Sequence, residues 1–101
     1  MAEVSHELLQ QLIGLIDELR EGSAGFLDQA GDQQLWYDRG YANGMLLALH
    51  DLDQAGALGD RRPDDPDELG AHLAMAWGKA YRHGETMGSR ETHEITGTQM
   101  Q

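Results

Sequence analysis

A chain of 101 residues with 40% hydrophobic and 25% charged side chains has the composition of one small globular domain and is too short for two. Eighteen acidic residues against seven lysines and arginines give a formal net charge of −11. This charge disfavours direct binding to nucleic acid, because such binding uses cations to displace phosphate counterions. The chain has no cysteine, which excludes disulfides, thiolate metal sites and a cysteine nucleophile.

The first predicted helix covers residues 5–21. Its apolar side chains recur at helical spacing and form one wide stripe, with glutamines and acidic residues on the opposite side. Ser5 is a typical N-cap, and Gly22 is a typical residue at a helix end. Residues 23–31 are predicted to connect this helix to the next, with one short extra turn that brings Phe26 into the core.

The second predicted helix runs from Gln33 to Ala55, between a cap at Asp32 and a stop at Gly56. Two glycines inside it each cost about 1 kcal/mol relative to alanine, so a packing contact must offset them. The helix is apolar on two sides, which predicts a central position in the fold.

A third helix is predicted from Pro66 to about Arg90. Its start, at residues 65–68, combines a cap, a proline at the first helical position and acids near the positive end of the helix dipole. The polar stretch 91–101 is predicted to be a flexible C-terminal tail, so that residues 1–90 form a single helical domain.

The second and third helices resemble each other when the sequence is shifted by 40 residues, because small and aromatic residues then align on one helical face. We interpret this face as a tight helix crossing, in which small residues let the backbones approach and aromatic rings fill the sides. A groove that receives a ligand or a partner helix is the alternative. The face consists of Tyr37, Gly40, Tyr41, Gly44, Trp77, Ala80, Tyr81 and Gly84.

Together these elements predict an all-α fold, namely a small antiparallel bundle of three main helices with one short extra turn, in which helices two and three are related by the internal repeat. Helix one is expected on the leucine side of helix two, and helix three on its glycine side. Because a chain of this size buries only a modest core, a homodimer that covers the apolar excess of helix two stays open.

The sequence offers no convincing catalytic or metal site. Residues 51–62 begin like a calcium loop, but the fifth and twelfth positions lack oxygen ligands. No histidine stands four residues from another, and no serine lies in a glycine-flanked elbow. We therefore expect no enzyme, no metal and no cofactor. A weak transition-metal site is the alternative, with the candidate ligands His83, Glu85, Glu91, His93 and Glu94.

Acidic charge is concentrated in the first two thirds of the chain, since residues 1–68 carry the whole net charge and residues 69–101 sum to zero. The third helix is predicted to carry a basic ridge of His72, Lys79, His83 and Arg90. The predicted partner-binding face is acidic, and it consists of Glu3, Glu7, Asp17, Glu18, Glu21, Asp28 and Asp32.

These features favour a non-enzymatic regulator that docks its carboxylates on a basic, nucleic-acid-binding surface of a partner protein. Small acidic inhibitors of nucleic-acid machinery, among them anti-CRISPR proteins and DNA mimics, share this character. The alternative is a homodimeric helical adaptor or anti-activator that binds through apolar and aromatic surface, for example Phe26, Trp36, Leu47 or the tyrosines.

The chain is expected to act in the cytoplasm and away from membranes. Its N-terminus is acidic where a secretory signal would be basic. No apolar run approaches the roughly 20 residues that a membrane span requires.

Overall fold

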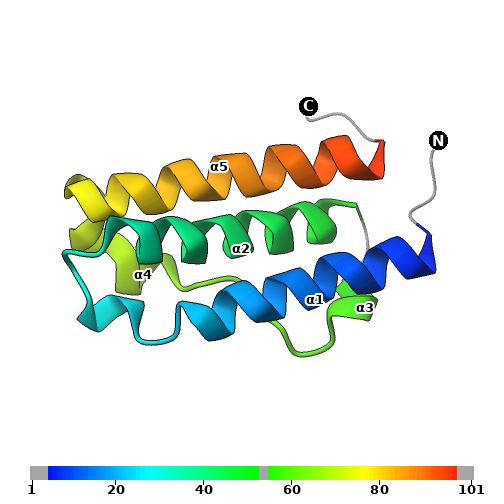
Figure 1. Cartoon of the computed structure of the whole chain (residues 1–101), viewed down its shortest axis with the longest axis horizontal. Helices are drawn as coiled ribbons and strands as arrows, with labels where there is room; N and C mark the ends of the chain where they lie inside the picture. Colours follow the sequence, from blue (N-terminus) through cyan, green and yellow to red (C-terminus); the bar gives the residue numbers. More distant parts are fainter. Residues whose placement is uncertain (1–4, 53–54, 98–101) are drawn as a thin grey trace.

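The computed structural model describes residues 5–52 and 55–97, which form helices and loops only. The predicted all-α bundle is confirmed. Its three long helices are α1 (His6–Gly22), α2 (Gln33–Asp51) and α5 (Ala76–Thr96). Short helical segments lie between them, namely η1 (Phe26–Asp28), α3 (Ala55–Leu58), α4 (Pro66–Leu69) and η2 (Gly70–Ala74). Figure 1 shows α2 in the middle, with α1 on one side and α5 on the other.

Three helices begin at the caps that the sequence predicts. The Ser5 hydroxyl accepts a hydrogen bond from the backbone N–H of Leu8 (3.1 Å), at the start of α1. The Asp32 carboxylate accepts one from the N–H of Leu35 (3.0 Å), at the start of α2. Asp65 caps α4 in the same way. These bonds satisfy N–H groups that have no partner inside the helix, and so fix where each helix starts.

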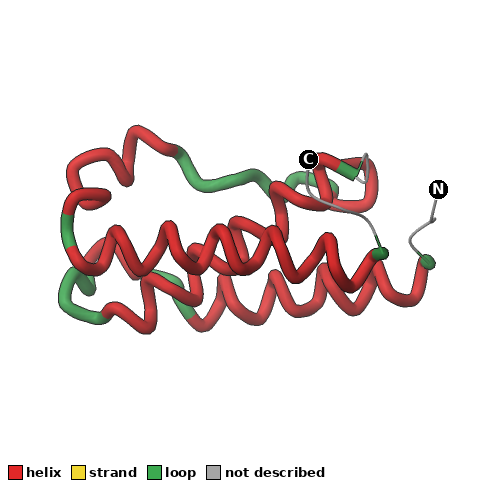
Figure 2. Tube along the Cα trace, turned by 90° about the horizontal axis from the view of Figure 1, so that it is seen from above, coloured by secondary structure: helices red, strands yellow, loops and turns green. Residues whose placement is uncertain are grey.

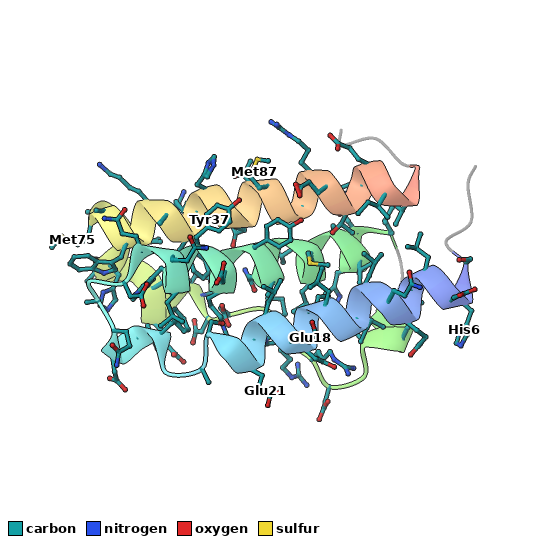
Figure 3. All side chains as sticks on the ribbon, in the orientation of Figure 1. His6, Glu18, Glu21, Tyr37, Met75 and Met87 are labelled. Carbon is teal, nitrogen blue, oxygen red and sulfur yellow. The ribbon has the colours of Figure 1, made fainter. Side chains whose placement is uncertain are left out.

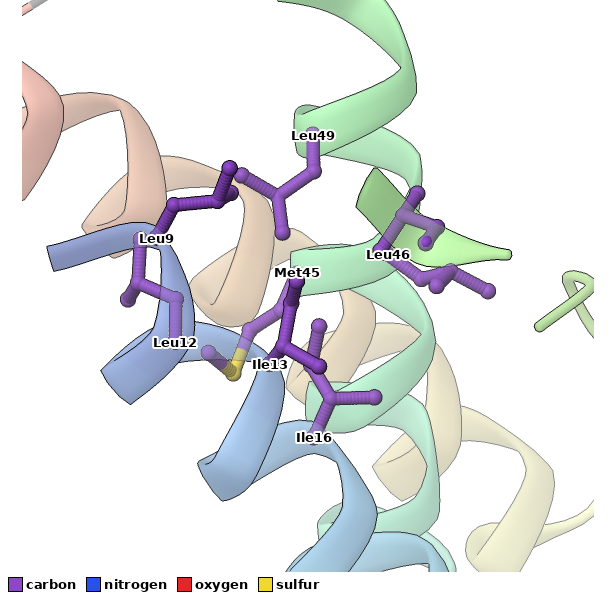
Figure 4. Packing of buried hydrophobic residues seen from close by; sticks show 8 residues of the cluster. Leu9, Leu12, Ile13, Ile16, Met45, Leu46 and Leu49 are labelled. Carbon is purple, nitrogen blue, oxygen red and sulfur yellow. The ribbon is translucent and has the colours of Figure 1, made fainter. Parts of the chain in front are cut away.

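The larger part of the core lies between α1 and α2 (Figure 4). The apolar stripe of α1 packs on the leucine side of α2, as the sequence predicts, and Leu58 of α3 closes the cluster. Burial of these side chains is the main favourable term that holds α1 in place. The buried members are Leu9, Leu12, Ile13, Ile16, Met45, Leu46, Leu49 and Leu58.

A second cluster closes the other end of the bundle, where Phe26, Trp36, Leu69 and Tyr81 pack together. The Phe26 ring meets the Trp36 indole edge-on at 4.8 Å between centroids, a favoured aromatic geometry. The Trp36 indole N–H donates to the carbonyl of Gln29 (3.1 Å). The predicted turn that brings Phe26 into the core is thus confirmed as η1.

The end of α2 differs from the prediction of a helix to Ala55. The helix ends at Asp51, residues 53 and 54 lie outside the described part, and Ala55 instead begins α3. The chain turns early because α3 carries Leu58, which is fully buried against α1 and α2.

The single helix predicted over residues 66–90 is divided in the structure. Met75 is extended (φ −90°, ψ 162°), and it separates η2 from α5. The segment folds back on α5 at Gly78, where an added Cβ would lie 1.9 Å from the carbonyl oxygen of His72. Only glycine permits this backbone contact, so the glycine accounts for the close return of η2.

The last helix is longer than predicted. It continues past Arg90 to Thr96 and ends at Gly97, which has a left-handed backbone (φ 77°) typical of a residue that follows a helix. Thr92 and Thr96 are buried, and the Thr96 hydroxyl donates to the carbonyl of Thr92 (2.8 Å). The first six residues of the predicted tail therefore belong to α5, and residues 98–101 lie outside the described part.

Helix direction also differs in part from the predicted antiparallel bundle. α1 runs antiparallel to α2, whereas α2 and α5 run parallel, since Gly40 lies against Tyr81 and Gly44 against Glu85. The chain between these helices returns along one side of the bundle, as Figure 2 shows for the segment from α3 to α4. This long return lets α5 start at the same end of the bundle as α2.

Candidate functional site

The helix crossing of α2 and α5 brings backbone against backbone. An ideal Cβ on Gly40 would lie 1.9 Å from the carbonyl oxygen of Tyr81, and one on Gly84 would lie 2.2 Å from that of Tyr37. Gly44 and Gly88 meet the opposite backbone just as closely. The four glycines therefore leave no room for a side chain at the crossing, and this contact offsets their poor helix propensity.

The contacts relate the two helices by an offset of 44 residues rather than 40. At this offset Tyr37 corresponds to Tyr81, and both helices read Tyr-x-x-Gly-x-x-x-Gly. The contacts are reciprocal, since the first glycine of each motif lies on the tyrosine of the other. The glycines recur every four residues, so offsets of 40 and of 44, which differ by about one helical turn, both align small residues on one face. The sequence alone therefore favoured the wrong offset. The signal that distinguishes the two offsets is Gly88, the second glycine of the α5 motif.

The aromatic residues of the predicted crossing face have separate surroundings. Tyr81 is buried in the core, whereas the ring of Tyr37 is half-buried, 6.3 Å from Tyr41 and 5.6 Å from His83. The Trp77 indole donates to Nδ1 of His72 (3.1 Å), beside the second core cluster. Ala80 is half-buried. The predicted residues are thus divided between the crossing and its flanks.

A buried ionic network around Asp64 was missed by the sequence analysis. The carboxylate is 9% exposed and accepts hydrogen bonds from the guanidinium of Arg39 (Nε–Oδ2 2.9 Å) and from the hydroxyl of Tyr81 (2.8 Å). Its backbone N–H donates to the side chain of Asn43 (2.8 Å), which in turn donates to Glu85 (2.7 Å). The network connects the loop before α4, residues 59–65, to both helices of the crossing. No local pattern marks Asp64, because its partners are distant in sequence.

Tyrosine hydroxyls on α2 and α5 donate to carboxylates. Burial, together with the charge and hydrogen bond of Asp64, raises the pKa of Tyr81 far above its usual range. Burial and the hydrogen bond to Glu91 (2.6 Å) likewise raise the pKa of Tyr41. Both groups are therefore held protonated in the folded protein.

Alkaline pH is expected to weaken the fold. Since the pKa of each tyrosine is raised above its unfolded value of 10.0, the stability that the two hydroxyls contribute is present below pH 10 and is lost as the pH rises further. Urea midpoints should fall between about pH 8 and pH 11, and they should fall less in Tyr81→Phe. Equal pH dependence of the wild type and this variant would contradict the assignment.

The acidic residues of the predicted partner-binding face lie at the surface. Glu7, Asp17, Glu18, Glu21, Asp28 and Asp32 are exposed, whereas Glu3 lies outside the described part of the chain. Asp17 is bound by the guanidinium of Arg61 (2.7 and 2.8 Å), and this hydrogen bond lowers the pKa of the carboxyl below its usual value. Asp17 is therefore paired with an arginine of the same chain, and its charge is already compensated.

Most cations in the first two thirds of the chain are turned toward internal acids. Arg39 binds Asp64, and its guanidinium lies 5.1 Å from the centre of the Phe26 ring. Arg20 lies 3.8 Å from the same carboxylate. Arg20 and Arg39, together with Arg61 and Arg62, line a cavity of about 440 Å³. Acidic side chains line the same cavity. The cations thus compensate acids close to the loop before α4 and leave other carboxylates uncompensated.

The predicted basic ridge is interrupted. Lys79, His83 and Arg90 are exposed on α5, but His72 lies on η2, before the break in the helix, and accepts the hydrogen bond from Trp77. The ridge is therefore confined to α5.

Two of the five candidate metal ligands, Glu85 and Glu91, are engaged in separate hydrogen bonds. Glu85 accepts from Asn43 and Glu91 accepts from Tyr41. Among the described residues, no group of three histidines or acids could hold a metal ion. Every helix in the described part is also too short or too polar to span a lipid bilayer.

Comparisons with protein-family models, with curated proteins and with solved structures find no match to this chain.

Proposed function

We propose that this protein is a non-enzymatic regulator that binds a partner protein by placing an acidic face of α1 on a basic surface. This α1 acidic face consists of Glu7, Glu18 and Glu21, with Asp28 and Asp32 beyond the end of the helix. The supporting observation is that these exposed carboxylates have no ion pair within the described residues, although the nearby arginines do.

The arrangement of the glutamates on α1 suits a partner with a positively charged surface. The three glutamates fall within about 60° of one another around the helix and span about 21 Å along it. Figure 3 shows Glu21 projecting away from the body of the bundle, with Glu18 on the same helix. A row of carboxylates at one edge attracts a cationic surface over distances near the Debye length and speeds encounter with it.

A surface that normally holds nucleic acid is the partner class that best fits this row. Such surfaces display lysines and arginines in rows that neutralise successive phosphates. A rigid helix with outward carboxylates presents negative charge as nucleic acid does, but without nucleobases. It can compete with nucleic acid for the same lysines and arginines. Binding of this kind is inhibitory by occlusion and requires no catalytic residue.

The test is capture of partners from cells of the source organism at about 50 and 200 mM salt, with identification by mass spectrometry. The bait is compared with Glu18→Gln/Glu21→Gln and with a matched control, Asp60→Asn/Glu94→Gln, which removes two exposed carboxylates elsewhere. We expect nucleic-acid-binding proteins that are retained at low salt, are lost at high salt and are lost by the α1 variant only. Retention that is equal in both variants, or independent of salt, would contradict the proposal.

A further inference from the structure

A second cavity, of about 360 Å³, lies between α2, the loop before α4, η2 and α5. Its walls are largely apolar, and it falls in the size range of pockets that bind small ligands or single side chains. Leu47 stands at this cavity and is 39% exposed, which is unusual for a leucine on the central helix of the bundle. The apolar walls are formed by Leu47, Pro63, Pro66, Leu69 and Leu73.

The amide, carboxylate and hydroxyl groups that line this cavity are already bonded within the protein. Asn43 bridges the backbone of Asp64 and the carboxylate of Glu85. The Tyr81 hydroxyl and the guanidinium of Arg39 occupy the Asp64 carboxylate. An apolar side chain that enters the cavity therefore breaks none of these hydrogen bonds. Its binding does not incur the free-energy cost of burying an unpaired polar group.

The charge around the opening is acidic. Glu85 lines the cavity directly, and Asp67 is exposed on α4 next to Pro66, which also lines it. Asp65 and Glu68 lie nearby on or beside α4 and line the first cavity. Among the described residues that line the cavity, Arg82 is the one cation. A basic segment matches this surround, whereas an acidic segment would be repelled.

We propose that this cavity receives one large apolar side chain, such as phenylalanine or leucine, from a basic segment of the partner protein. The inference rests on the proposed function in one respect, namely that the partner is basic. It adds a contact of a different kind on a different part of the molecule. A desolvated apolar anchor gives affinity and orientation that a row of exposed charges lacks, because exposed ion pairs are individually weak.

The test is titration of the isotope-labelled protein with three end-blocked tripeptides, Lys-Phe-Lys, Glu-Phe-Glu and Lys-Ala-Lys, followed by NMR. We expect Lys-Phe-Lys to shift the signals of Leu47 and Leu73, and the other two peptides to leave them in place at the same concentration. Equal shifts with Lys-Ala-Lys, or shifts confined to α1, would overturn the proposal.

Leu47→Arg blocks the cavity, and Leu15→Arg is a matched control on α1, since both leucines are 39% exposed. We expect Leu47→Arg to weaken Lys-Phe-Lys binding by at least about tenfold, and the control to leave it within about twofold. Glu18→Gln/Glu21→Gln should keep the phenylalanine-dependent shifts, which separates this site from the α1 acidic face. A dimer in the wild type that Leu47→Arg converts to a monomer would assign the cavity to a second copy and overturn the proposal.

Discussion

Gly84→Ala should destabilise the protein by about 3 kcal/mol or more, although alanine is the better helix former. The new methyl group would lie 2.2 Å from the carbonyl oxygen of Tyr37 and 2.9 Å from the backbone nitrogen of Tyr41. Both atoms belong to the main chain of α2, so no side chain can rotate away and the helices must separate. In a domain of this size we expect the midpoint of thermal unfolding to fall by more than about 10 °C. Gly84→Leu should have a larger effect.

The matched control is Gly14→Ala, on the exposed side of α1. No atom lies within 4 Å of its ideal Cβ, so the substitution should stabilise the protein by about 0.5–1 kcal/mol through helix propensity alone. Opposite signs for the same chemical change at the two glycines would identify the crossing. Similar changes in both variants would show that Gly84 has room for a side chain.

Asp64→Ala should also be strongly destabilising, by about 3 kcal/mol. The substitution leaves the guanidinium of Arg39, which is 16% exposed, without its carboxylate, and it leaves the hydroxyl of Tyr81 without its acceptor. Loss of both bonds weakens the attachment of the loop before α4 to α2 and α5, and leaves the hydrogen bond from the backbone N–H of position 64 to Asn43. Urea unfolding measures the loss, and amide hydrogen exchange around Asp64 should show faster opening of the loop.

Asp60→Ala is the control for this substitution, because Asp60 is an exposed carboxylate of the same loop and makes no ion pair within the described residues. Its effect should stay within about 0.5 kcal/mol. If Asp64→Ala were as mild as this control, the network would contribute little to stability.

Local signals in the sequence were sufficient for the start of helices and for the main core. The hydroxyl of Ser5 and the carboxylates of Asp32 and Asp65 act within three residues, so their spacing alone indicates each cap. The apolar stripe of α1 is periodic over four turns and leaves one choice of buried face.

Helix ends and helix direction depend on distant contacts, and the sequence did not determine them. α2 stops at Asp51 because Leu58 must reach the core, and α5 starts only after Met75 because Gly78 accepts the backbone of η2. A glycine motif fits parallel and antiparallel crossings equally well. The choice depends on how far the connection returns along the bundle, which periodicity does not reveal.

The acidic surface was predictable as composition but not as geometry. The excess of carboxylates is plain in the sequence, yet the assignment of Asp17 to Arg61 and of Asp64 to Arg39 depends on residues 44 and 25 positions apart. Only the folded arrangement separates carboxylates that stabilise the protein from those of the α1 acidic face.

Parallel pairing of α2 and α5 places the glycine crossing, the Asp64 network and the cavity beside Leu47 where they are. It is tested most directly by distances between paired spin labels on cysteines, which can be introduced specifically because the chain has none of its own. Labels at His50 and Arg90 should be closer than labels at Gln34 and Arg90 by roughly 10 Å, since the parallel register puts the ends of both helices together. A shorter distance for the Gln34 pair would mean that the helices run antiparallel and would contradict the structure described above.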